Sequence, residues 1–243
     1  MSTDLDFGLD GLSPVDEHSA DLQRNTWEGD YRLLAQHDVG ERSFLLTFDT
    51  AATWDYLPGA PSLAAFDIVR DRQQGTFSMQ ASKHAVLAFS QKWLIERGCP
   101  PSATVPAGFL PADDLTVLIT ERISRSGDRY GVFDHQVMDG TPEAWTMAVD
   151  RAATELPVRL FLEEIQPDHH TYTVREGAFP DLDAAEEWLE NRPTPLPPAP
   201  EDLGAEARRA HAALARSGTV TPTPVVAPAP AAPAAQPVVQ RSM

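Results

Sequence analysis

Apolar and polar positions begin to alternate regularly at Tyr31, and the pattern predicts a β-hairpin there. Residues 31–48, YRLLAQHDVGERSFLLTF, contain two apolar runs on either side of DVGE, a turn-like stretch that includes Gly40. Two strands joined by so short a connection pair antiparallel, so this segment is expected to start a sheet.

Helical spacing follows the hairpin. Residues 61–75, PSLAAFDIVRDRQQG, predict a helix with Ser62 as its N-cap and Gly75 just beyond its end. Residues 78–98 give the strongest helical pattern, because apolar side chains recur every seven positions, at Met79, Val86 and Trp93.

The pattern then predicts a strand–turn–strand–helix order twice, over 115–156 and 157–192. In the first unit, LTVLITERISRSGDRYGVFDHQVM predicts a hairpin that turns at SRSGD, because Leu115, Val117 and Ile119 alternate. The next segment predicts a helix with Thr141 as its cap and Pro142 at its first position; its apolar face would hold Trp145, Val149, Ala152 and Leu156.

The second unit has the same predicted order. VRLFLEEIQPDHHTYTVREGAF predicts a hairpin, and PDLDAAEEWLENR predicts a helix in which Asp183 and Glu186 have capping-box spacing. Trp145 and Trp188 fall at comparable places in the two predicted helices. We therefore expect an α+β fold: an antiparallel sheet built from β-hairpins in ββα units, with helices packed on one face.

The two ends of the chain differ from this body in composition. An acidic start and a C-terminal region with eleven of the 22 prolines favour disorder on both sides of one globular domain. The predicted organisation is a disordered acidic tail (1–24), the α+β domain (25–192), a stiff Pro-rich spacer (193–200), a short tethered helix (201–217) and a disordered Pro/Ala-rich tail (218–243).

Charge and cysteine content narrow the possible functions. The net charge of −17 repels phosphate backbones, so we expect no direct binding of nucleic acid. A single cysteine, Cys99, allows neither an internal disulfide nor a cysteine-based zinc site. Because no signal peptide or long apolar run is recognisable, we expect a cytoplasmic protein that does not use a membrane or a cofactor.

Two groups of aspartate and histidine are the candidates for catalysis. Asp134 and His135 lie on a predicted strand, whereas Asp168, His169 and His170 lie in QPDHH. His169 and His170 are also the candidate metal ligands, but consecutive side chains on a strand point to opposite faces, and QPDH suits a type I turn. The preferred interpretation is a turn, with His135 as an ordinary strand residue.

The predicted helix 201–217 is the candidate docking element for a partner. Its narrow apolar stripe and basic side chains could fold against an acidic groove, or the helix could pack on its own domain. The residues assigned to partner binding are Leu203, Ala207, Arg208, Arg209 and Leu214.

The function expected from these features is a non-enzymatic adaptor that binds a protein partner through the α+β domain, the tethered helix or both. The acidic charge of the chain is compatible with a basic partner. Two alternatives stay open. One is a hydrolase or metal-assisted enzyme that uses the two Asp/His groups, and the other is an acidic mimic of nucleic acid that inhibits a DNA-binding protein. The sequence does not give the oligomeric state.

Overall fold

A computed structural model describes residues 5–52, 59–138, 141–192 and 194–199. The predicted helix 201–217, with its partner-binding residues Leu203, Ala207, Arg208, Arg209 and Leu214, lies outside the described residues, as does the tail 218–243. Within the described part, the protein is a mixed α+β structure with two five-stranded sheets and four α-helices.

The first half of the chain forms one sheet and two helices. Its strands have the order β1-β5-β4-β3-β2, in which only the short β1 runs parallel to its neighbour. The elements are β1 (Ser13–Pro14), α1 (Glu17–Asn25), β2 (Tyr31–Val39), β3 (Arg42–Asp49), β4 (Leu63–Asp71), β5 (Thr76–His84) and α2 (Leu87–Glu96).

The second half repeats this arrangement. Its sheet has the order β6-β10-β9-β8-β7, again with one short parallel strand at an edge. The elements are β6 (Leu110–Pro111), α3 (Asp114–Ser124), β7 (Tyr130–Val137), β8 (Glu143–Asp150), β9 (Val158–Gln166), β10 (Thr171–Phe179) and α4 (Leu182–Asn191). Element order and strand order are the same in both halves, so the fold is an internal structural repeat.

Equivalent side chains support the repeat at its first helices. Asp16 caps α1 by accepting a hydrogen bond from the Ser19 N–H, and Asp113 caps α3 by accepting one from the Thr116 N–H. The hydroxyl groups of these two residues then accept backbone N–H groups of the adjacent long strand. Met79 donates to Ser19 over 3.0 Å, and Val174 donates to Thr116 over 3.1 Å.

The last helices of the two halves share the sequence W-L-x-x-R. In α2 the guanidinium of Arg97 lies 3.6 Å from the ring centre of Trp93, and beside α4 that of Arg192 lies 5.7 Å from the ring of Trp188. A cation over an indole face stabilises both helix ends in the same way. Trp188 therefore corresponds to Trp93, and the predicted correspondence with Trp145 is wrong.

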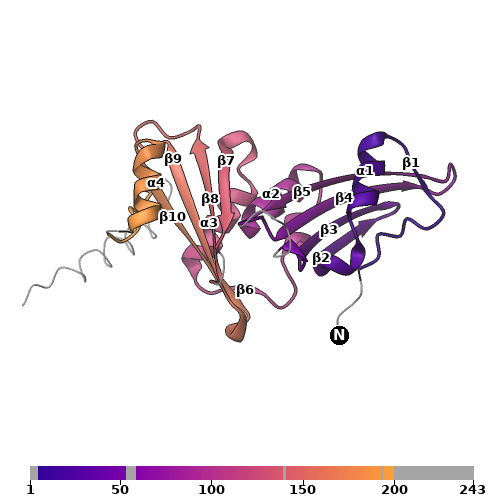
Figure 1. Ribbon diagram of the computed structural model, residues 1–243, viewed down its shortest axis with the longest axis horizontal. Coiled ribbons are helices and arrows are strands. Elements are labelled where there is room, and N and C mark those ends of the chain that lie inside the picture. Colours follow the sequence, from indigo (N-terminus) through magenta and orange to yellow (C-terminus); the bar gives the residue numbers. More distant parts are fainter. Residues whose placement is uncertain (1–4, 53–58, 139–140, 193, 200–243) are drawn as a thin grey trace, which may run out of the picture. The chain divides into compact units, whose positions relative to one another are not determined.

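Each sheet has one helix on each face. On β4, Ala64 and Phe66 belong to the apolar cluster on the α1 side, whereas Leu63 and Ala65 belong to a cluster with α2. Helix α3 packs on β10, and α4 packs on the other face of the second sheet. Because α2 and α3 also contact each other, the layers are α1, first sheet, α2 with α3, second sheet, α4 (Figure 1).

Several predicted elements match these strands and helices. Residues 31–48 form the paired strands β2 and β3, residues 158–179 form β9 and β10, and residues 180–192 contain α4. Helix α4 is capped by Asp181, which accepts the N–H of Ala184, and not by Asp183. Ala185 and Trp188 are buried, as predicted.

The prediction of a helix over 61–75 is wrong, because this segment is β4. Both faces of β4 are covered, and a strand buried on both faces is an unbroken apolar run that periodicity does not distinguish from a buried helix. Gly75 has a φ of +67° in the turn to β5, so its conformational freedom serves a hairpin and not a helix end.

The helix predicted over 78–98 is correct only in its second half. Met79 lies on β5, and α2 begins at Leu87. The seven-residue spacing thus linked Met79 on a strand with Val86, the N-cap of α2, and with Trp93 inside α2. Gly98, with a φ of +99°, follows the helix end as expected.

The first predicted ββα unit, 115–156, is wrong in both of its parts. Leu115, Val117 and Ile119 lie on helix α3, whose missed signal is the N-cap Asp113. The predicted helix with Thr141 and Pro142 at its start is instead strand β8. On this strand alternate residues face opposite sides, with Trp145, Met147 and Val149 on one and Ala144, Thr146 and Ala148 on the other.

Residues 5–24 of the predicted disordered tail are structured. Leu5 and Phe7 are buried against the first sheet, and Phe7 packs on Phe66 with ring centres 5.1 Å apart. Two acids of the predicted tail have structural roles, since Asp16 caps α1 and Asp6 accepts the N–H of Gly8. Glu28, beyond the predicted tail, accepts the N–H of Phe7. Apolar residues spaced between acids were enough to bury one side of the segment.

The predicted Pro-rich spacer is also packed, over its described residues 194–199. The indole N–H of Trp188 donates to the Thr194 carbonyl over 3.1 Å, and Leu196 joins the apolar cluster beside α4. Pro197 accepts the N–H of Ala178 over 3.1 Å, and a bridge joins Pro198 to Gly177. We call residues 194–199 the strap, because they lie along β10.

None of the described helices is long and apolar enough to cross a membrane.

Candidate functional site

The two predicted Asp/His groups do not come together. Asp134 and His135 are exposed on β7, where His135 lies opposite Thr146 of β8, and Thr146 lies opposite Phe161 of β9. Asp168 and His169 belong to the turn after Gln166, several residues farther along β9 and two strands away. Among the described residues, no group of three or more histidine, cysteine or acidic side chains could hold a metal ion.

The QPDHH stretch is a turn, as preferred from its sequence. Asp168 and His169 lie in a single 3-10 turn, and His170 has a φ of +51° before β10 begins. All three side chains are exposed. The His170 ring packs edge-on against Phe109, with ring centres 6.4 Å apart.

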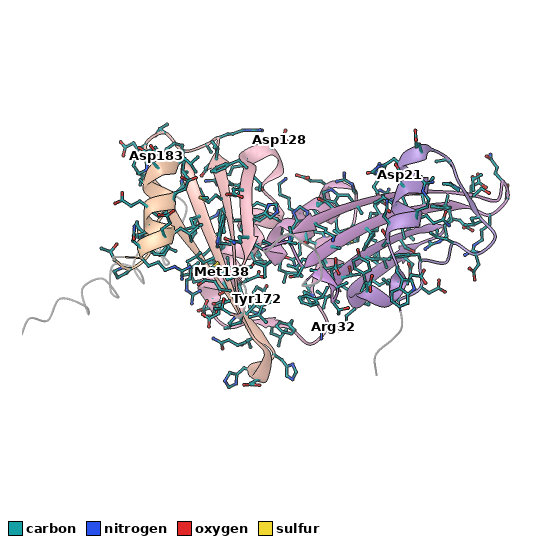
Figure 2. All side chains as sticks on the ribbon, viewed as in Figure 1. Asp21, Arg32, Asp128, Met138, Tyr172 and Asp183 are labelled. Carbon is teal, nitrogen blue, oxygen red and sulfur yellow. The ribbon has the colours of Figure 1, made fainter. Side chains whose placement is uncertain are left out.

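A cavity of about 670 Å³ is lined by residues of both halves of the repeat. Strands β2 and β3 line it from the first half, and β8, β9 and β10 line it from the second. Arg32 and Tyr172, which lie on different sheets, both border it (Figure 2). Its apolar lining includes Leu34, Leu63, Leu87, Phe109, Ala144 and Ile165.

Two acids of this lining are buried: Asp49, which pairs with Lys83, and Glu163. Glu163 lies on β9 between Ala144 of β8 and Val174 of β10, and its exposed fraction is only 2%. Burial removes water from the carboxyl group and raises its pKa to about 8, although the Leu87 N–H donates to Oε2 over 3.0 Å and opposes the shift. Glu163 is therefore a neutral acid over most of the physiological pH range.

Aromatic rings surround the same space. Phe48, Phe109 and Tyr172 line the cavity, and burial raises the pKa of the Tyr172 hydroxyl, with the nearby Glu163 acting in the same direction. A hydrogen bond with Thr120 opposes that shift. The lining thus combines aromatic rings with the acidic side chains of Asp49, Glu143 and Glu163.

The charged rim of the cavity is mostly paired. Asp49 forms an ion pair with Lys83 over 2.8 Å, and Glu143 pairs with Arg192 through two contacts, one of 2.8 Å. Arg32 lies 5.3 Å from the ring centre of Phe48. Asp49 is buried, whereas the side chains of Lys83 and Arg192 are exposed to water at the edge of the site.

A second polar cluster in the second half is structural. Asp150 accepts hydrogen bonds from Arg129 and Arg159, and Arg122 pairs with Glu176. Burial alone would raise the pKa of Asp150, but the hydrogen bond from Arg129 and further contacts hold it below its ordinary value. These groups form ion pairs inside the core, although Nη1 of Arg159 and Nε of Arg122 are buried without a hydrogen-bond partner among the described residues.

Cys99 does not supply a nucleophile. It is buried after α2, and burial raises the pKa of its thiol to about 11. A thiol with so high a pKa holds its proton at neutral pH and is unreactive.

The sequence analysis did not identify Glu163 as a site residue. Glu164 is exposed, but Glu163 shares a strand face with Phe161 and Ile165. On a strand, residues two positions apart share a face, so the apolar residues Phe161 and Ile165 could have indicated that Glu163 is buried.

Comparisons of the chain with protein-family models, with curated proteins and with solved structures gave no match. The fold and the site define the class: an internally repeated α+β protein with a mostly apolar cavity that holds the buried acid Glu163.

Proposed function

We propose that this protein is a non-enzymatic adaptor whose α+β domain binds a protein partner by taking an apolar group of that partner into the cavity. The observation that carries the proposal is the cavity itself. Its volume of about 670 Å³ lies within the range of about 300–1,000 Å³ that is usual for binding pockets, and its lining is mostly apolar with a few polar groups.

The net charge of −17 favours a basic partner, because it speeds encounter with cations and repels acidic competitors. The enzymatic alternative gains no support, since Asp134 and His135 lie apart from His169 and His170. A mimic of nucleic acid needs unpaired acids, whereas described acids such as Asp67 and Asp150 pair with arginine.

The test is capture of partners from the native host by the tagged full chain and by a chain truncated after residue 200, read by mass spectrometry. Cutting there keeps the strap in place, so a difference reports on the last 43 residues alone. We expect one specific partner with both chains, because the cavity is intact in both. Loss on truncation would move docking to the C-terminal segment, and no specific partner would contradict the adaptor function.

A further inference from the structure

The internal repeat shows that Glu163 replaces an apolar residue. Met79 and Val174 are equivalent, because each donates its N–H to a hydroxyl on the first helix of its half, that of Ser19 or of Thr116. On the neighbouring strand, Ile68 lies opposite Met79 and Glu163 lies opposite Val174. Ile68 is fully buried in an apolar cluster that includes Phe7. The same position in the second half thus holds a carboxyl group that faces a cavity, at a cost in stability that packing does not require.

The hydrogen bonding of Glu163 leaves room for a ligand. Its Oε2 accepts the Leu87 N–H at the start of α2, and in the described part of the chain its Oε1 accepts no hydrogen bond. A buried acid of this kind gains most from a partner that either accepts its proton or carries a positive charge.

The surroundings favour a positive charge. Phe48, Phe109 and Tyr172 line the cavity, aromatic rings attract cations, and Arg32 already lies over the Phe48 ring. The overall charge of −17 raises the local concentration of cations. A buried carboxyl group combined with aromatic rings is the chemistry that recognises an ammonium group on an apolar stem.

We propose that Glu163 and the rings of Phe48, Phe109 and Tyr172 form a binding site for an apolar primary amine, which the partner supplies as a lysine side chain flanked by apolar residues. This inference rests on the proposed function and specifies the group that enters the cavity. The ammonium group pairs with Oε1 of Glu163, and its stem lies among the apolar lining. Glu163 gives up its proton on binding, because the pair is more stable than the neutral acid beside a cation.

The test is calorimetric titration of the full chain at pH 7 with three probes of equal chain length: n-octylamine, 1-octanol and octanoate. Two buffers with different heats of ionisation, phosphate and HEPES, measure proton release. Glu163→Gln removes the acid and keeps an acceptor for the Leu87 N–H. Glu164→Gln is the matched control, since it removes the same charge from the exposed neighbouring residue.

We expect n-octylamine to bind at least about tenfold more tightly than 1-octanol, with release of a proton. Glu163→Gln should abolish both the preference and the proton release, and Glu164→Gln should change neither. Proton release in the unmodified chain needs no variant, so it tests the site even if Glu163→Gln folds poorly.

Equal binding of amine and alcohol, tighter binding of octanoate, or no binding of any probe would overturn the proposal. Each of these results is separable from failure of the adaptor function. If partner binding still depends on an open cavity but the preference for the amine is absent, the cavity remains the docking site and the proposed recognition of an ammonium group is wrong.

Discussion

The carboxyl group of Glu163 has the most unusual surroundings of the described side chains in the cavity. It is nearly fully buried, its neighbours are mostly apolar, and its one hydrogen bond comes from the first turn of α2. A helix N-terminus favours the charged carboxylate, but loss of water outweighs that effect here. The residue therefore carries a cost in stability that should vary with pH.

That cost has a definite direction. Because burial raises the pKa of Glu163 from 4.5 to about 8, an unfolded chain loses this proton at a lower pH than the folded chain does. Stability should fall between these two pH values, by at most about 1.4 kcal/mol for each pH unit. Glu163→Gln should remove this loss. The free energy of unfolding of the variant, relative to that of the unmodified chain, should therefore increase as the pH rises from 5 to 8.

Chemical denaturation at several pH values measures this difference. Glu164→Gln, which alters an exposed acid, should follow the unmodified chain throughout. Parallel pH curves for Glu163→Gln and the unmodified chain would show that Glu163 ionises at an ordinary pH.

At the scale of elements, sequence patterns located hairpins better than the segments around them. The 31–48 and 158–179 hairpins have clear turns, and the capped helix α4 has a clear apolar stripe. Strand β4 and helix α3 were misassigned, because burial on two faces hides alternation and because short apolar runs fit either period. Whether a helix covers one or both faces of a strand depends on the tertiary structure, and the local sequence pattern does not show it.

The strap depends on a glycine in β10. A Cβ atom at Gly177 would lie 2.5 Å from Cδ1 of Leu196, so the strap approaches the strand at a distance that only glycine allows. Gly177→Ala should displace Leu196 and lower stability by about 1–3 kcal/mol. Because Trp188 donates to Thr194, its fluorescence should report the displacement.

Gly131→Ala is the matched control for this substitution. Gly131 also lies in a strand of the second sheet, but a Cβ there would meet its nearest neighbour, Nη2 of Arg151, at 3.5 Å, an ordinary contact. Equal stability and fluorescence in the two variants would mean that the strap does not pack tightly on β10.

At the scale of the whole molecule, the repeat explains where the cavity lies. Each half has a sheet with a helix on both faces, and the middle layer is shared by α2 and α3. Residues 5–12 cover the outer part of the first sheet, whereas the equivalent region of the second half borders the cavity. Two related units have thus come to differ at the position that holds Ile68 in one and Glu163 in the other.

The sequence contained only a short signal of this repeat. KWLIERG and EWLENRP share Trp, Leu and Arg at the same spacing, in α2 and α4. At the first helices the capping aspartates Asp16 and Asp113 are identical, whereas Ser19 and Thr116 share a hydrogen-bonding role without sharing identity. The cavity was not predictable, because its lining comes from strands of both halves that the patterns did not place together.

The most direct test of the account is the affinity of the captured partner, once purified, for three full-length chains. Ala144→Phe fills the cavity from β8, whereas Ala152→Phe adds the same bulk at an exposed position away from the lining. We expect Ala144→Phe to weaken the affinity for the partner at least about tenfold and Ala152→Phe to leave it unchanged, with both variants folded. Equal affinity for all three chains would contradict the central claim that the partner enters this cavity.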